Sequence, residues 1–332
     1  MKDRPMGNST TAPFTRQTGR VVLYSHDTFG LGHLRRSRTV ATALTQAGVA
    51  TNAIILTGSP IAGRFTFPEA VDHVRLPGVK KLSDGSYVSQ TTGMDIDETT
   101  ALRASLIQSA VSQYDPDLLI VDKEPTGFRG ELLPTLEDLR TDGKTSVVLG
   151  LRDVLDDPDV LAAEWARKGA VTATESFYDE IWVYGLRSVY DPTAGLPLSP
   201  ETRRRIHWTG YLRREATMPG APQDGPYILV TPGGGGDGQS MVDLVLSAYE
   251  QDPNLSPRAV LVYGPFLSGD VRDDFETRVE ALNGRVEAVG FESNIEALFA
   301  GAEGVVCMGG YNTFCEVLSF DTRAVIVPRT RP

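Results

Sequence analysis

The sequence predicts an α/β protein with two parallel-sheet domains in tandem, and three observations support this class. Short apolar, β-branched runs alternate with longer amphipathic runs along the chain. This is the pattern of strands and crossover helices in parallel sheets that are covered on both faces. The alternation stops at a charged, Pro- and Gly-rich segment, 212–225, and then starts again. A length of 332 residues also fits two domains of about 100–200 residues each.

These features divide the chain into four parts. Residues 1–19 are polar and lack the apolar core of a signal peptide, so we expect a disordered tail. Residues 20–211 form the first domain, 212–225 the linker, and 226–332 the second domain. The chain ends directly after the apolar run Ala324–Val327. Because a parallel strand needs a crossover helix, we expect the second domain to be truncated.

The individual elements follow from the hydrophobic periods of the first domain. We expect strands at Val21–His26, Asn52–Thr57, His73–Leu76, Leu118–Asp122, Ser146–Leu151, Ile181–Tyr184 and Ile206–Thr209. We expect helices at His33–Ala47, Asp95–Gln113, Gly130–Arg140, Val160–Lys168 and Val171–Tyr178. Gly48 is the natural end signal of the first helix, and residues 79–93 read as a polar loop.

The second domain repeats the same alternation. We expect strands at Tyr227–Thr231, Ala259–Tyr263, Val286–Phe291, Val305–Met308 and Ala324–Val327. We expect helices at Ser240–Glu250, Arg272–Leu282, Ile295–Ala300 and Thr313–Ser319. Clefts between two α/β domains are favoured ligand sites, so we expect the function to lie where the two domains face each other.

Composition excludes several function classes. Lys and Arg number 32 against 43 Asp and Glu, for a net charge of −11, whereas nucleic-acid binders usually present a basic face. Cys307 and Cys315 are too few for a disulfide framework, and we expect both to be small core residues. The four histidines lack ligand-like spacing with cysteine, so no metal site is expected. No run of 18 apolar residues is present, and we expect a cytoplasmic protein.

The exit of the first strand is the strongest local signal in the first domain. Gly30-Leu31-Gly32 follows the strand that ends at His26, and a helix begins at about His33. Backbone amides at such a helix start can hold a phosphate or sugar oxygen. The third Gly of the dinucleotide fingerprint is missing, which argues against a nicotinamide site. His33 is the first candidate base, because imidazole titrates near ~6.5; the alternative is that it only shapes the loop. His26 is the second histidine candidate.

Other polar residues of this domain lie at strand ends, where ligands of open α/β sheets bind. Asp122 ends a strand and is an alternative base. Arg152 directly follows the next strand, and Arg36 lies in the first helical turn. Both arginines are candidates for binding an anionic acceptor, and the alternative is that these are simple polar strand ends and a solvated helix face.

Two glycine-rich segments mark the second domain. Four consecutive glycines, Gly233, Gly234, Gly235 and Gly236, lie between a strand and a helix. Their entropic cost, about 0.5–1 kcal/mol each relative to Ala, indicates close approach to a ligand such as a diphosphate. The segment Gly309-Gly310-Tyr311-Asn312-Thr313-Phe314-Cys315-Glu316 closes a later strand. Asn312 or Thr313 is expected to cap the next helix, whose N-terminus attracts phosphate. Glu316 can accept both ribose hydroxyls or act as a capping-box partner of Thr313.

In this order, these segments resemble the GT-B glycosyltransferases, and most closely glycosyltransferase family 28. The resemblance rests on Gly30-Leu31-Gly32-His33 with Arg36, the tetraglycine segment, Gly290-Phe291 and the segment 309–316. It implies two Rossmann-like domains that face a cleft, with the acceptor bound by the first domain and the donor by the second. The Gly-Gly-x-Gly-Thr form of the family's donor motif is here Gly309-Gly310-Tyr311-Asn312-Thr313.

The resemblance also implies roles for individual residues. Phe291 lies beside the base, Gly309, Gly310, Asn312 and Thr313 face the diphosphate, and Glu316 faces the ribose. Gly32 and His33 face the reaction centre from the first domain. The predicted donor contacts are therefore Gly32, Gly233, Gly234, Gly235, Gly236, Phe291, Asn294, Gly309, Gly310, Asn312, Thr313 and Glu316.

The implied reaction is an inverting, metal-independent transfer of a hexose or N-acetylhexosamine from a UDP-sugar to an acceptor hydroxyl, with no cofactor. The acceptor is not readable from the sequence; a lipid-linked acceptor, as opposed to a polysaccharide, would place the protein at the inner face of the membrane. A UDP-sugar epimerase of the same fold and a non-catalytic nucleotide-sugar binding protein are the alternatives.

Overall fold

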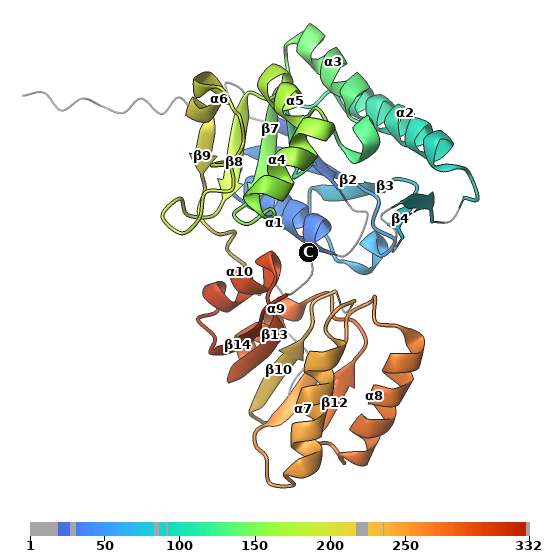
Figure 1. Cartoon of the computed structure of the whole chain (residues 1–332), viewed down its shortest axis with the longest axis vertical. Coiled ribbons are helices and arrows are strands. Elements are labelled where there is room, and N and C mark those ends of the chain that lie inside the picture. Colours follow the sequence, from blue (N-terminus) through green and yellow to red (C-terminus); the bar gives the residue numbers. More distant parts are fainter. Residues whose placement is uncertain are drawn as a thin grey trace, which may run out of the picture.

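A computed structural model describes residues 19–26, 31–82, 86–90, 92–216, 225–234 and 236–329. The described chain forms two α/β domains stacked one above the other, with the first domain uppermost in Figure 1. Residues 1–18 of the expected tail, Gly30, Gly235, most of the linker (217–224) and residues 330–332 lie outside the described residues, whereas Gly19, also assigned to the tail, begins the first strand.

The first domain is built on a seven-stranded parallel sheet in the order β3-β2-β1-β6-β7-β8-β9. Its strands are β1 (Gly19–Ser25), β2 (Ala50–Thr57), β3 (Val71–Arg75), β6 (Leu118–Asp122), β7 (Ser146–Arg152), β8 (Glu180–Tyr184) and β9 (Ile206–Trp208). Its helices are α1 (Gly32–Gln46), α2 (Ile96–Tyr114), α3 (Leu133–Asp142), α4 (Pro158–Arg167), α5 (Ala170–Phe177) and α6 (Pro200–Arg204). The order reverses between β1 and β6, which makes this the switch point where ligands of such sheets bind.

Alternate residues of one strand enter two different cores, because side chains alternate across a sheet. Val22 and Tyr24 of β1 pack with α2 to α5 on one face. Val21 and Leu23 pack with α1 on the other face. Leu23 lies opposite Ile55 of β2 and Ile120 of β6, so both faces of the central strands are buried. This explains why the strands read as continuous apolar runs.

The second domain is a five-stranded parallel sheet in the order β12-β11-β10-β13-β14. Its strands are β10 (Tyr227–Thr231), β11 (Arg258–Val262), β12 (Val286–Val289), β13 (Gly304–Met308) and β14 (Ala324–Val327). Its helices are α7 (Gln239–Gln251), α8 (Gly269–Ala281), α9 (Ile295–Gly301) and α10 (Tyr311–Ser319). The switch point lies between β10 and β13, and these two strands are followed by the two glycine-rich segments. Cys307 and Cys315 are buried free thiols, as expected.

The structure differs from the sequence prediction in a few elements. The expected polar loop 79–93 contains an antiparallel hairpin, β4 (Val79–Lys81) with β5 (Tyr87–Ser89). The strands are too short and too polar to give a period-two signal. The short helix α6 was not expected either. Helix α1 ends as predicted, with Gly48 at φ +69° directly after its C-cap.

The two domains touch through helices α1 and α10, which lie on facing edges of the domains in Figure 1. Tyr311 and Cys315 of α10 belong to the same apolar cluster as Leu34 and Ala41 of α1. Across the ranges that the structure describes, no helix is both long and apolar enough to cross a membrane.

Candidate functional site

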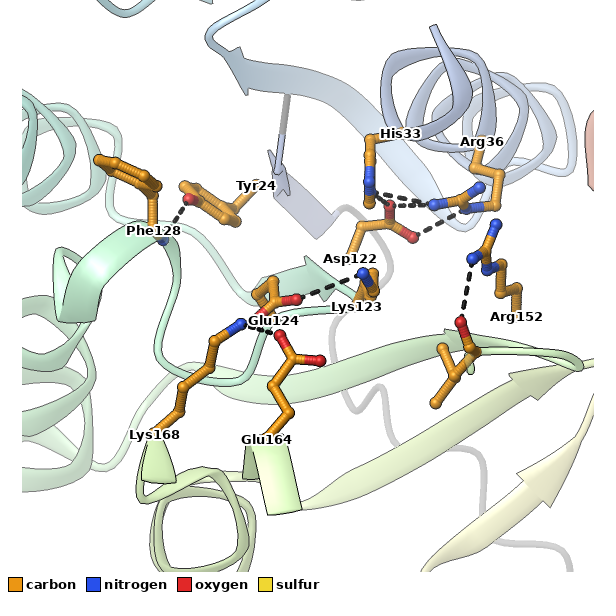
Figure 2. A network of polar contacts seen from close by, with 11 residues as sticks. Tyr24, His33, Arg36, Asp122, Lys123, Glu124, Phe128, Arg152, Glu164 and Lys168 are labelled. Atoms are coloured by element: carbon orange, nitrogen blue, oxygen red, sulfur yellow. Dashed lines mark hydrogen bonds and ion pairs between the residues drawn. The ribbon is translucent and has the colours of Figure 1, made fainter. Parts of the chain in front are cut away.

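The structure places the candidate bases of the first domain at its switch point. Helix α1 follows β1, and β6 is the strand on the other side of the reversal. His33 comes from the first turn of α1, and Asp122 is the last residue of β6. Parallel strands end at one edge of a sheet, so residues 89 positions apart meet there (Figure 2).

His33 and Asp122 form a close pair rather than two alternative bases. Nδ1 of His33 lies 2.6 Å from Oδ2 of Asp122. Arg36, one turn further along α1, donates to both carboxylate oxygens of Asp122, at 3.1 Å from Nε and 2.8 Å from Nη2. Burial raises the pKa of Asp122, but the Arg36 charge and the hydrogen bonds from His33 and Arg36 outweigh it, so this pKa lies well below its usual range.

An ionised Asp122 fixes the orientation and tautomer of His33. The carboxylate only accepts, so the proton of the neutral imidazole sits on Nδ1 and the lone pair is left on Nε2. Arg36 Nη2 lies 3.0 Å from the same nitrogen. Because the protonated Nδ1 cannot accept a hydrogen bond, this is a close contact and not a hydrogen bond. A histidine held in this way by a carboxylate is the usual arrangement of a general base.

The second histidine candidate has a different environment. His26 is buried, with 8% of its surface exposed, and its ring centroid lies 5.5 Å from that of His33. Burial lowers its pKa to about 3, in spite of Glu124 nearby. His26 is therefore a neutral group at physiological pH, next to the His33–Asp122 pair.

The predicted acceptor-binding arginines lie close to Asp122 but have partners of their own. Arg36 is buried on the Asp122 carboxylate. Arg152, at the end of β7, donates from Nη2 to the Leu155 carbonyl at 3.1 Å, as Figure 2 shows. Burial and the Arg36 charge lower the pKa of Arg152. Their roles toward an acceptor stay predictions, while Arg36 has a clear structural role in holding Asp122.

In the second domain, the two glycine-rich segments lie side by side. The tetraglycine segment also packs against the turn after β11: Gly233 has φ +76°, Gly264 of that turn has φ +85°, and a β-carbon at Gly264 would lie 2.4 Å from the Gly233 carbonyl oxygen. This close backbone contact requires glycine. A β-carbon at Gly233 or at Gly310 would lie 3.6 Å from the guanidinium of the same residue, Arg329, so the segments after β10 and β13 converge on one cation.

Arg329 was not among the residues predicted from the sequence. It follows β14, donates from Nε to the Gly309 carbonyl at 2.8 Å and from Nη2 to the Pro232 carbonyl at 3.3 Å, and pairs with Asp237. Its side chain remains about one-third exposed. In the sequence, Arg329 could have been recognised by its position after a strand, because such residues lie at the carboxyl edge of the sheet, which also carries both glycine segments.

The start of α10 faces the first domain. Gly310 is the N-cap of this helix, and no side chain caps it, so the prediction that Asn312 or Thr313 caps the helix was wrong. The reason is that the helix begins at Tyr311, so both residues lie inside it. Asn312 has other partners: Nδ2 donates to the Gly32 carbonyl of the first domain at 3.2 Å, and Oδ1 accepts from Arg214 of the linker at 2.6 Å. Thr313 is buried beside it.

Glu316 is buried and also faces the first domain. Only 1% of its surface is exposed, and its carboxylate pairs with Arg35 of α1, which also pairs with Glu296 at 3.0 Å. Glu316 therefore does not act as a capping-box partner of Thr313. Its role as ribose contact stays a prediction, and the structure shows that Arg35 occupies the same carboxylate.

The remaining predicted donor contacts lie at the same interface. The ring of Phe291 packs edge-on against Phe65, with centroids 5.4 Å apart, and Arg64 lies 4.5 Å above it. Asn294 borders a separate cavity of about 640 Å³ together with Arg38 of α1. The sequence alone gave no signal for the arginine partners, because cross-domain contacts have no local pattern.

Comparisons with known proteins agree with this geometry at the level of the fold. No family model and no curated protein matches the sequence. The glycosyltransferase SnogD from Streptomyces nogalater has a TM-score of 0.56 at 18% identity, over 95% of this chain and 82% of that chain. For MurG of Acinetobacter baumannii the TM-score is 0.51 at 13% identity, over 94% and 78%.

A third solved structure shows that the same fold carries another activity. The UDP-GlcNAc 2-epimerase from Methanocaldococcus jannaschii has a TM-score of 0.55 at 11% identity, over 93% of this chain and 83% of that chain. The chain thus has the fold of the GT-B glycosyltransferases, with two Rossmann-like domains, which confirms the predicted fold class. A fold supports many functions, so the chemistry has to be argued from the site.

Proposed function

We propose that this chain is a glycosyltransferase that moves a hexose or N-acetylhexosamine from a UDP-sugar to an acceptor hydroxyl. One observation carries the proposal. The carbonyl of Gly32, the residue before the His33 base, accepts a hydrogen bond from Asn312 at 3.2 Å. A carboxylate-held imidazole of one domain and a glycine-flanked helix start of the other are thus immediate neighbours.

In the proposed reaction, Nε2 of His33 takes the proton of the acceptor hydroxyl. The hydroxyl oxygen attacks the anomeric carbon of the donor, the bond from that carbon to the diphosphate oxygen breaks, and the electron pair leaves with UDP. Asp122, 2.6 Å from Nδ1, stabilises the imidazolium that forms. A single displacement from the face opposite the diphosphate inverts the anomeric configuration.

On the donor side, the diphosphate is proposed to lie between the glycine segments after β10 and β13. Backbone amides there and the N-terminal end of α10 favour an anion, and Arg329, which also pairs with Asp237, adds a guanidinium group. These groups supply the stabilisation of the leaving diphosphate, so the proposed transfer is metal-independent. Phe291 would border the uracil and Glu316 the ribose.

The decisive experiment follows the fate of the donor. Purified protein is incubated with UDP-glucose or UDP-N-acetylglucosamine and candidate acceptors, and NMR detects UDP, glycoside and free sugar. A transferase releases UDP and forms a glycoside, an epimerase changes the sugar without net UDP release, and a binding protein does neither. His33→Gln should abolish release, whereas the matched His73→Gln, on β3 outside the site, should not.

Calorimetry with UDP tests the donor half independently of any acceptor. Glu316→Ala is expected to weaken UDP binding by about 1–3 kcal/mol, the typical cost of a lost hydrogen bond to a charged group. His33→Gln should leave this affinity unchanged, since His33 is placed at the acceptor side. Absence of UDP binding to the wild-type chain would overturn the proposal.

A further inference from the structure

A second feature of the first domain is a cavity of about 360 Å³ beside the His33–Asp122 pair. Its lining residues are His26, Tyr87, Glu124, Thr126, Gly127, Phe128, Arg129, Gly130, Leu133 and Lys168. Among them, His26 is also the second histidine candidate from the sequence. The volume lies at the lower end of ligand cavities, about 300–1,000 Å³, which suits a single small ring system better than a long chain.

The cavity lies next to the reactive pair, which it approaches through His26 and Glu124. His26 lines it, and the ring of His26 meets that of His33 edge to face at 5.5 Å. Glu124 lines it as well and lies two residues after Asp122. A ligand seated in this cavity would therefore contact His26, the ring neighbour of the proposed base, on the domain that does not carry the glycine segments.

The loop 123–130, which supplies much of the cavity lining, has an unusual backbone conformation. Lys123 has φ +72° and Arg129 has φ +50°, both in the left-handed region that non-glycine residues rarely adopt. Such conformations persist where surrounding contacts enforce them, and they gather at functional sites. One of these contacts is a hydrogen bond to the first strand: the Phe128 amide donates to the Tyr24 hydroxyl at 3.0 Å (Figure 2).

The support under this loop is a buried polar network. The Tyr24 hydroxyl donates to Glu131 at 2.6 Å, and Arg103 donates to both oxygens of Glu131, each at 2.6 Å. Arg103 is fully buried. A bidentate ion pair of this kind fixes geometry as well as adding stability, so the cavity wall is formed before any ligand binds.

The cavity combines aromatic surface with compensated charge. The rings of Tyr87 and Phe128 meet edge to face at 5.0 Å. The charged side chains of the wall have opposite partners: Lys168 pairs with Glu124 at 2.8 Å, and Arg129 pairs with Asp97 at 2.6 Å. Burial would raise the pKa of Glu124, but the neighbouring His26 ring, which is protonated only at acid pH, and the Lys123 and Lys168 ammonium groups lower it to about 2.

This composition selects the chemistry of the occupant. Aromatic rings bury the C–H faces of a saturated ring, while a carboxylate and an ammonium bond to hydroxyl groups. Because the charges of the wall compensate one another, a charged ligand would enter without a counter-charge and would be disfavoured. An uncharged ring rich in hydroxyl groups meets all of these conditions.

We propose that this cavity is the acceptor subsite and that it takes an uncharged sugar residue, with the hydroxyl to be glycosylated directed at His33. The inference rests on the proposed transferase function and specifies its acceptor class. In the step it serves, the acceptor O–H proton passes to His33, the acceptor oxygen bonds to the anomeric carbon, and UDP leaves with the electron pair of the broken bond.

Saturation-transfer NMR in the presence of saturating UDP tests the inference. The probes are the methyl β-pyranosides of glucose, galactose, mannose and N-acetylglucosamine, with methyl β-glucuronide as the charged counterpart. At least one neutral glycoside is expected to bind at least tenfold more tightly than the glucuronide. Binding of none of them at 10 mM, or equal binding of the glucuronide, would overturn the inference.

Two variants assign the binding to the cavity. Tyr87→Ala removes part of the aromatic wall and should weaken the neutral glycoside at least tenfold, whereas the matched Tyr190→Ala, outside the lining, should not. Glu124→Gln removes one of the two carboxylates that pair with Lys168, leaving Glu164 as the other, and should shift preference toward the glucuronide at least fivefold. A glycoside affinity that is unchanged in both variants would overturn the inference.

UDP calorimetry and thermal melting on the same samples separate the two proposals. Both cavity variants should keep the UDP affinity of the wild type, because neither residue lies on the donor side, and the melting curves must show that both are folded at the assay temperature. Loss of the neutral-sugar preference with intact UDP binding would reject only the acceptor class. Failure of UDP to bind the wild type would reject the proposed function itself.

Discussion

Replacing Asp122 by Asn tests the proposed base more directly than any other substitution. The amide keeps the size of the side chain but removes the negative charge that His33 contacts at 2.6 Å. During the proposed reaction His33 becomes an imidazolium, so this charge contributes more in the transition state than in the ground state. We therefore expect the variant to bind UDP normally and to turn over slowly.

The size of the effect follows from the geometry. Two unit charges about 4 Å apart interact by about 4 kcal/mol at an effective dielectric constant near 20. His33 is 15% exposed and Asp122 is 5% exposed, which screens the pair slightly and brings the expected loss to about 3 kcal/mol. Since about 1.4 kcal/mol corresponds to a factor of ten in rate, kcat should fall about 10²-fold.

The assay is UDP release from the donor that supports turnover, at saturating donor concentration. Asp117→Asn is the matched control, because Asp117 precedes the same strand at its other end and accepts from the Arg20 amide at 2.8 Å. Arg36 loses its counter-charge in Asp122→Asn, so melting curves must show that the variant is folded at the assay temperature. A folded variant that releases UDP at the wild-type rate would refute the assignment of the pair as the base.

Three further outcomes are expected. Arg329→Gln should weaken UDP binding about tenfold in calorimetry, since one charged contact of about 1.5 kcal/mol is lost, and Arg323→Gln, just before β14, should not; equal affinities would remove Arg329 from the donor site. Arg35→Met should lower the melting temperature, because it leaves Glu316 buried without its partner. It should also enlarge the stabilisation by UDP, since the ribose no longer competes for that carboxylate; an unchanged UDP shift would argue against the ribose contact. His26 has a folded pKa of about 3 against ~6.5 in the unfolded chain, so the unfolded state binds the extra proton between these values and stability falls as the pH drops. Between pH 7 and pH 5 this amounts to about 2 kcal/mol, and His26→Asn should flatten that part of the urea-unfolding profile; an equally steep profile would contradict the assignment.

Much of the architecture could be predicted from local sequence. The central strands are apolar on both faces because both faces are covered, and this produces an unmistakable run such as Leu118–Asp122. The candidate bases followed from the same logic, since polar residues that directly follow such runs lie at the carboxyl edge of the sheet. The hairpin of β4 and β5 was not predicted, because short polar strands show no clear alternation of apolar and polar residues.

The sequence by itself determined the two-domain fold, the glycine segments and the chemical types of the candidate site residues, because strand runs and turn glycines are local signals. Only the tertiary structure decided their pairings. His33 lies against Asp122, Arg35 pairs with Glu316, and Arg329 bonds to the backbone beside both glycine segments. Each of these contacts joins residues from separate βα units or from different domains, and the energy that selects such a partner depends on distance and burial in the folded chain rather than on spacing along it.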